Sequence, residues 1–143
     1  MKVKIEAIYK PDLSTSKELP YFEAKVPAGF PSPAADYEEY QLDLNKHLIK
    51  NPAATFFVRV SGDSMIGAGI HDGDLLIVDR SLDPKDKNVV IAVIDGELTV
   101  KRIRIRRKKI ILEAENINYS SKEISEDSDF QVWGVVTNVI HSL

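Results

Sequence analysis

A serine and a lysine are the residues whose types and surroundings point to covalent chemistry. Ser64 follows a β-rich segment, residues 55–60, and lies in the short sequence Ser61-Gly-Asp-Ser-Met65. A tight turn there places a hydroxyl beside consecutive backbone N–H groups, the arrangement that a serine nucleophile and its oxyanion require. The simpler interpretation is an ordinary turn serine. A base near Ser64 is needed to favour catalysis.

Lys101 is the candidate base, because no histidine is suitably placed. Alternation along residues 97–107 puts it on a face with isoleucines, opposite the arginines. If that face is inward, burial lowers the lysine pKa, and moving it from about 10.4 to near 7 takes roughly 4–5 kcal/mol. A neutral Lys101 then accepts the proton of Ser64. The alternative is a lysine whose stem reaches solvent.

Other kinds of site are disfavoured by the residue types. The chain has no Cys, which excludes disulfides, thiol nucleophiles and Cys-based zinc sites. Residues 62–67 have the glycine spacing of a phosphate-binding loop, but Ala68-Gly69 follows where Lys and a hydroxyl residue are required. The acidic Asp72-Gly-Asp74 is interpreted as a turn. We predict no metal and no cofactor, since the histidines lie on different predicted elements without ligand spacing. They are His47, His71 and His141.

The elements that position Ser64 and Lys101 are mostly strands. Beyond Pro52, six segments rich in β-branched residues are separated by turn signals. Asp95-Gly96, between two of them, predicts a two-residue hairpin turn. The fold class is therefore mainly β, with a compact core. The six segments are residues 55–60, 74–79, 88–94, 97–105, 109–114 and 130–140.

The chain before this core has a different character. An alternating segment (Val3, Ile5, Ala7) is compatible with a small strand, and closely spaced prolines then favour an extended arm. Residues 36–50 carry apolar side chains at helical spacing, with Asp36 as N-cap, and predict one short helix. The predicted organisation is an N-terminal arm at 1–28, a linker with the helix at 29–50, and the core at 51–143.

The net charge of −3 averages two unlike regions. Lys101–Lys109, KRIRIRRKK, holds 7 of the 19 basic residues, which leaves 12 basic against 22 acidic residues elsewhere. This tract suits either nucleic-acid phosphates or an acidic protein partner, although it has no aromatic residues for base stacking. No apolar run is long enough to cross a bilayer, and the N-terminus lacks a signal-peptide core. We expect a cytoplasmic protein without a membrane partner.

The chain contains three short blocks in order, which are Ser61-Gly-Asp-Ser-Met65, Asp72-Gly-Asp-Leu75 and Asp95-Gly-Glu-Leu-Thr-Val-Lys-Arg102. Together they resemble the LexA/UmuD-type self-cleaving Ser/Lys peptidases. The likeness runs from about residue 26 to the end, and three segments are most similar to the UmuD branch, namely Pro31–Tyr37, Asp43–Asn45 and Val132–Val136. It implies a core of curved antiparallel strands, with Ser64 as nucleophile and Lys101 as general base. We also expect the backbone N–H groups of Ser64 and Met65 to bind the oxyanion.

The resemblance also implies a function. Such proteins cut themselves at an Ala-Gly or Cys-Gly bond, and Ala28-Gly29 is the matching bond in an extended, proline-flanked segment. In the UmuD branch a RecA filament on single-stranded DNA promotes the cut after DNA damage. The trimmed homodimer then joins the catalytic subunit of a Y-family polymerase for error-prone translesion synthesis. Ala28, where that branch often has Cys, and the heavy charge of residues 102–109 depart from its pattern.

Two alternatives belong to other classes of protein. One is a non-enzymatic module that contacts nucleic acid through the basic strand at 101–109. The other is a fragment of a LexA-like or phage repressor. Residues 1–28 are too few and too rich in proline for the helix-turn-helix of such repressors, which favours the polymerase-subunit interpretation.

Overall fold

The computed structural model of the chain describes residues 2–22 and 38–143. It has two compact units. The first combines Met1–Pro11 with Asn51–Leu143, and the second is Asp12–Lys50. In the ranges described, no helix has both the length and the apolar character needed to span a membrane. Ser64 and Lys101 both belong to the first unit, so this unit contains the candidate site.

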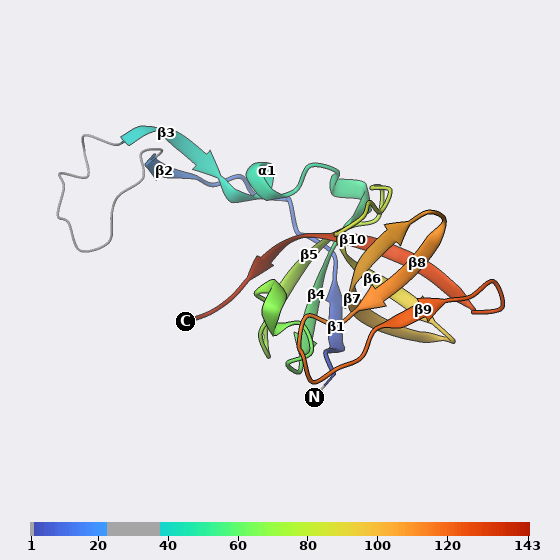
Figure 1. Cartoon of the computed structure of the whole chain (residues 1–143). Coiled ribbons are helices and arrows are strands. Elements are labelled where there is room, and N and C mark those ends of the chain that lie inside the picture. Colours follow the sequence, from blue (N-terminus) through green and yellow to red (C-terminus); the bar gives the residue numbers. More distant parts are fainter. Residues whose placement is uncertain (1, 23–37) are drawn as a thin grey trace. The chain divides into compact units, whose positions relative to one another are not determined.

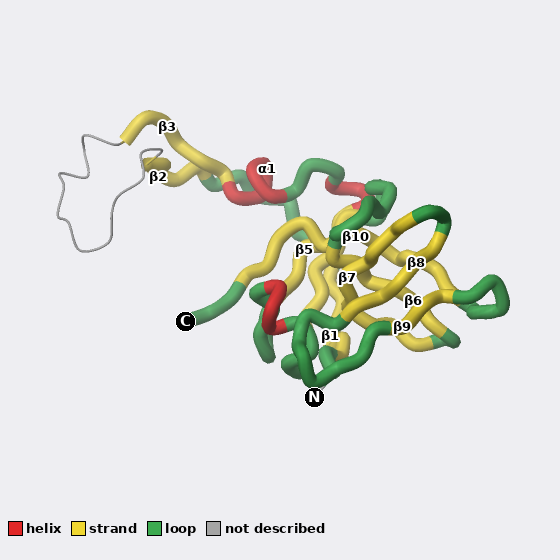
Figure 2. Tube along the Cα trace, in the orientation of Figure 1, coloured by secondary structure: helices red, strands yellow, loops and turns green. Residues whose placement is uncertain are grey.

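One antiparallel sheet of eight strands forms the first unit (Figures 1 and 2). The strand order is β1-β4-β5-β10-β6-β7-β8-β9, and the sheet curls so that β1 approaches β7. The predicted mainly β fold of curved antiparallel strands is thereby confirmed. The strands are β1 (Lys4–Tyr9), β4 (Thr55–Ser61), β5 (Leu75–Asp79), β6 (Val89–Ile94), β7 (Glu97–Arg106), β8 (Lys109–Glu113), β9 (Lys122–Ile124) and β10 (Phe130–Ile140).

Two hydrophobic clusters hold the curled sheet together, and β6 contributes to both. Its neighbouring residues Val90 and Ile91 point to opposite faces, and each is fully buried in a different cluster. This explains why the β6 sequence is a continuous apolar run rather than an alternating one. The cluster around Ile91 also contains Met65, the residue after Ser64, and Val100, the residue before Lys101. The candidate residues are thus anchored by buried neighbours.

Tight turns connect the central strands as the sequence predicts. Asp95 and Gly96 both have positive φ angles, 49° and 84°, as the two-residue hairpin between β6 and β7 requires. The β7–β8 hairpin turns through Arg107 and Lys108, with φ of 48° and 67°, although neither is a glycine. A non-glycine side chain is strained in this region. This second turn therefore has a local conformational cost.

The second unit contains β2 (Glu18–Phe22), β3 (Glu38–Asp43) and the helix α1 (Leu44–Leu48). The prediction of a helix over residues 36–50 is wrong in its first half, because β3 pairs with β2 instead. The side chain of Asp43 then accepts a hydrogen bond from the Asn45 N–H at 3.0 Å and starts the helix. Asp36, the expected N-cap, lies outside the described residues.

Candidate active site

Ser64 lies in a turn that begins where β4 ends. Gly62 adopts a φ of 99°, and its N–H donates to Asp72 Oδ1 at 2.9 Å, which ties the turn to the loop before β5. Met65 begins a short 3-10 helix, Ile66–Ala68, and is fully buried. Ser64 itself is only 1% exposed. The turn thus fixes a serine hydroxyl within the protein rather than at its surface.

The backbone N–H groups around Ser64 fall into two sets. Within residues 2–22 and 38–143, those of Ile66, Gly67, Ala68, Gly69 and Ile70 all donate to backbone carbonyls. Those of Ser64 and Met65 donate to none of the described groups. Unused donors beside a hydroxyl are what an oxyanion site needs. Among the described residues these two groups have no other acceptor, and their role as oxyanion donors stays a prediction.

The N-terminal end of β1 covers the Ser64 hydroxyl. The backbone N–H of Val3 donates to Ser64 Oγ at 2.7 Å, and the Val3 side chain is buried in the same cluster as Met65. Strand β1 continues from there along β4, from the Lys4–Ser61 pair to Tyr9–Phe57. An extended main chain therefore already occupies the space beside Ser64. The sequence predicted a small strand here but not its position against the serine.

Lys101 is partly buried in β7, and its environment opposes a positive charge. Burial, followed by the nearby ammonium of Lys2, lowers the pKa of Lys101 from its ordinary value. Lys101 lines a cavity of about 1030 Å³ together with Val3 and residues of the adjoining β1. The direction of the pKa shift is the one that the alternation of the strand predicts.

Lys2 and Val3, just before β1, interact with the two candidate residues. The Val3 N–H is bonded to Ser64, and the ammonium of the adjacent Lys2 acts electrostatically on Lys101, so two successive residues each interact with one of the candidates. In the part of the chain that the structure describes, no hydrogen bond joins Lys101 Nζ to Ser64 Oγ. Ala28 and Gly29 lie outside the described residues.

Known proteins are similar to this chain over most of its length. The model of the Peptidase S24-like family matches residues 20–137. The chain belongs to this family. It is 48% identical to Protein SamA of Salmonella typhimurium over 85% of this chain and 84% of SamA, and 39% identical to Protein MucA of Escherichia coli over 99% of this chain and 94% of MucA. The LexA repressor of Aliivibrio fischeri is 37% identical over 82% of this chain and 57% of the repressor. The resemblance drawn from the three sequence blocks is confirmed.

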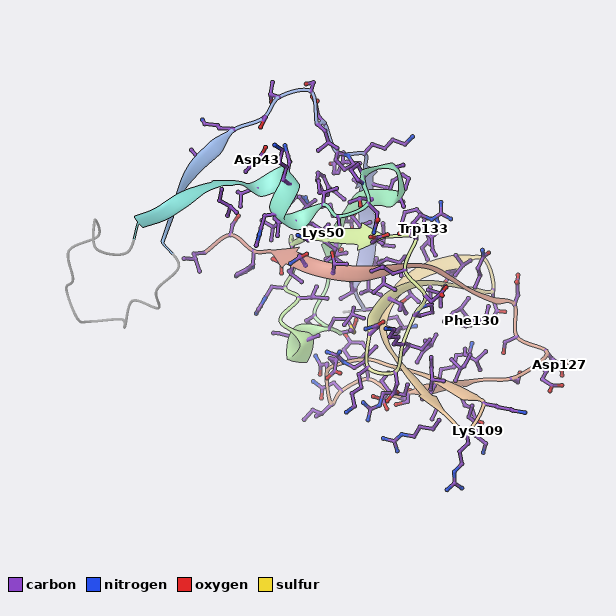
Figure 3. All side chains as sticks on the ribbon, turned by 90° about the horizontal axis from the view of Figure 1, so that it is seen from above. Asp43, Lys50, Lys109, Asp127, Phe130 and Trp133 are labelled. Carbon is purple, nitrogen blue, oxygen red and sulfur yellow. The ribbon has the colours of Figure 1, made fainter. Side chains whose placement is uncertain are left out.

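The basic tract of this S24-like chain divides into two parts. Arg102 forms an ion pair with Glu115, and Arg104 pairs with Glu113 at 3.7 Å. At the end of the β7–β8 hairpin, residues 106–109 are exposed and form no ion pair among the described residues. Figure 3 shows Lys109 at this end, among side chains that terminate in nitrogen. The arginines of β7 are thus partly neutralised, whereas the turn remains a cationic tip.

The sequence did not predict that two histidines of this S24-like chain meet. His71 and His141 stack with ring centroids 4.5 Å apart, and both lie beside the buried carboxylate of Asp74. Their separation along the chain hid this cluster. Knowledge of the register between β5 and β10 would have revealed the cluster, because the Leu75–Ile140 pair brings Asp74 next to His141. His47, in contrast, lies in α1 of the second unit.

Proposed function

We propose that this chain is an autocatalytic serine peptidase that cuts its own Ala28–Gly29 bond with Ser64 as nucleophile and Lys101 as general base. The observation that supports it most is the segment just before β1, where Val3 is bonded to Ser64 and the neighbouring Lys2 acts on the lysine whose pKa is lowered. This region accepts an extended peptide, and it contains both a hydroxyl and an amine that loses its proton more readily than usual. Those are the requirements for acyl transfer to serine.

The proposed reaction proceeds in two steps. Neutral Lys101 takes the proton of Ser64 Oγ, the oxygen attacks the Ala28 carbonyl carbon, and the N–H groups of Ser64 and Met65 bind the oxyanion. Protonated Lys101 then gives its proton to the Gly29 nitrogen as the peptide bond breaks. Lys101 then takes a proton from water, which attacks the ester carbonyl of the acyl-enzyme; the bond from this carbon to Ser64 Oγ breaks, and Lys101 returns the proton to Oγ. Before the first step, the Val3 N–H has to leave Ser64 Oγ.

The proposed biological role is in the DNA-damage (SOS) response. Similarity to SamA, MucA and the LexA repressor supports an SOS self-cleaving peptidase in the cytoplasm. On this proposal a RecA filament on single-stranded DNA promotes the cut. The trimmed homodimer then becomes the accessory subunit of a Y-family polymerase in translesion synthesis.

The test is incubation of the purified full chain at increasing pH, followed by mass spectrometry. A product that begins at Gly29 is expected, and it should form faster as Lys101 loses its proton. Ser64→Ala should remain intact, and Lys101→Ala should lose at least about 100-fold in rate. Ser125→Ala and Lys109→Ala are matched controls on exposed residues and should cut normally. Cutting of Ser64→Ala at the wild-type rate would contradict the proposed mechanism.

A second candidate function is binding of an anionic partner by the cationic tip. Its support is the exposure of residues 106–109, outside the ion pairs formed by Arg102 and Arg104. If the partner is nucleic acid, affinity for single-stranded DNA should fall steeply with salt, and replacing Lys108 and Lys109 by Gln should reduce that slope by about 1.4. Binding that is insensitive to salt would favour a protein partner instead.

A further inference from the structure

Three side chains from two distant segments form a compact cluster at one end of β5 and β10. His71 lies in the loop before β5, Asp74 immediately precedes this strand, and His141 immediately follows β10. One ligand atom from each of the three lies within 4.8 Å of the other two. The antiparallel pairing of β5 with β10 fixes this arrangement, because Leu75 is paired with Ile140. The cluster is therefore built by the sheet rather than by a chance contact between loops.

The carboxylate of Asp74 is the centre of the cluster. It is 2% exposed, and it accepts from the His71 backbone N–H at 2.7 Å through Oδ2. Its Oδ1 lies 2.6 Å from His141 Nδ1, and its Oδ2 lies 3.8 Å from His71 Nδ1. A buried carboxylate with an imidazole nitrogen on each oxygen is a strong attractor for a cation.

One atom of the cluster lacks a partner. His71 Nδ1 is buried and has no hydrogen-bond partner among the described residues, although the rest of the ring is partly exposed. Buried polar atoms are rarely left in this state, and an unfilled ion site is one explanation of such an atom. The partial exposure of both rings, 43% and 40%, leaves a route by which an ion can enter.

We propose that His71, Asp74 and His141 form a binding site for a divalent transition-metal ion, with Zn²⁺ as the ion that suits the ligands. Two imidazoles and one carboxylate are typical zinc ligands, and three protein ligands leave a coordination position for water. Zinc bonds of about 2.0–2.1 Å place tetrahedral ligand atoms roughly 3.3 Å apart, and the three ligand atoms here lie within 4.8 Å of one another, so side-chain rotations have to bring them closer by at most about 1.5 Å. Binding replaces the His141–Asp74 hydrogen bond by bonds to the ion and gives His71 Nδ1 a partner.

The ion would join the end of β10 to the loop that supports Ser64. Asp72, in the same loop as the proposed ligands, accepts a hydrogen bond from Gly62, and Ile70 donates to the Met65 carbonyl. The expected consequence is stabilisation of the folded chain and of this loop. All three ligands lie within residues 51–143, so the site is independent of whether the chain cuts itself.

Calorimetric titration of the untagged full chain with zinc chloride tests the site. Saturable binding of one ion per chain is expected, together with a rise of about 5–10 °C in the unfolding midpoint at 100 times the dissociation constant. A chelator should reverse this rise. Absence of one-to-one binding would overturn the proposal.

Matched variants locate the bound ion. His141→Asn retains an N–H near the position of Nδ1 but removes the imidazole, and His71→Ala removes the unpartnered ring. Each should weaken zinc binding at least about tenfold, whereas His47→Ala should bind as wild type does. X-ray absorption at the zinc edge is the measurement that does not depend on variants. A spectrum without two imidazole ligands, or unchanged affinity in both variants, would refute the site.

Discussion

Lys101 has an ammonium group in surroundings that disfavour its charge, and this affects stability as well as catalysis. Burial lowers its folded-state pKa below the ordinary value of 10.5, so the unfolded chain binds more protons between these two pH values. Folding stability should therefore rise with pH across that window and be lost again as pH falls through the folded pKa.

We predict that Lys101→Met reduces this pH dependence. Denaturant unfolding between pH 7 and 10, in a Ser64→Ala background that keeps the chain whole, should show a flatter profile for the Met variant. Lys109→Met, at an exposed position, is the matched control and should retain the wild-type slope. Equal slopes in all three chains would mean that burial does not perturb Lys101.

Val3 is the residue that holds β1 on the nucleophile. Val3→Pro removes the N–H that donates to Ser64 Oγ but keeps an apolar side chain of similar size. A hydrogen bond contributes about 1 kcal/mol, so self-cleavage should become about fivefold faster. Val3→Ala keeps the N–H and separates this effect from loss of packing. A Val3→Pro chain that cuts no faster than Val3→Ala would show that the bond does not restrain the reaction.

The composition of the candidate site could be predicted from sequence, but its surroundings could not. Ser64 and Lys101 are predicted from a strand-end turn and from strand alternation, which are local patterns, together with the resemblance of three short blocks to a peptidase family. The contact of Val3 with Ser64 and the meeting of His71 with His141 depend on which strands become neighbours. Such long-range pairing has no signature within a short window of sequence.

At the scale of elements, the hairpins β6–β7 and β7–β8 have turns with positive φ angles, but the second turn residue is glycine in the first hairpin and lysine in the second. Gly96 has a φ of 84°, and no atom lies within 4 Å of the place that a Cβ would take, so Gly96→Ala should cost about 1 kcal/mol through backbone strain alone. Lys108 has a φ of 67°, which strains a non-glycine residue. Replacing it in Lys108→Gly should relieve this strain and stabilise the chain by about 1 kcal/mol.

Urea unfolding of the two variants checks the prediction for these turns. A neutral or destabilising Lys108→Gly would show that the lysine side chain has stabilising contacts that compensate for its conformation. The expected gain would instead mean that the cationic tip has a cost in stability, as is common at sites retained for binding.

The six strands predicted from β-branched runs all occur, each with ends within one residue of those expected. The error was the helix, because residues 38–43 have apolar spacing compatible with a helix but pair with β2 in the structure. Strand β9, at Lys122–Ile124, is too short to be seen in the sequence. Local pattern thus predicted the strands that form the core but not the short ones at its margin.

On the scale of the whole molecule, the cut proposed at residue 28 separates β1 from the rest of its own sheet. Val3 is 3% exposed, Ile5 packs against the same cluster, and β1 pairs along β4. We predict that the fragment 1–28 remains bound after cleavage and co-elutes with residues 29–143 in native size-exclusion chromatography. Mass spectrometry of the eluted peak identifies both pieces.

A specific protease site at residues 28–29 in a Ser64→Ala chain tests fragment retention separately from self-cleavage. Val3→Asp, which places a charge in the core, should release the fragment. Ile8→Asp, at a residue 42% exposed, should not. Immediate loss of the fragment from the otherwise unaltered chain would show that β1 depends on its covalent connection.

The position of β1 also determines what is left when that fragment dissociates. Strand β4 has β1 on one side and β5 on the other, so its backbone from Phe57 to Arg59 is paired across both edges. Loss of β1 leaves one row of these N–H and C=O groups facing water, beside an apolar surface that Val3 had covered. Cleavage of one peptide bond, followed by dissociation of the fragment, therefore exposes an unpaired edge of β4, and another extended chain can bind there as a strand.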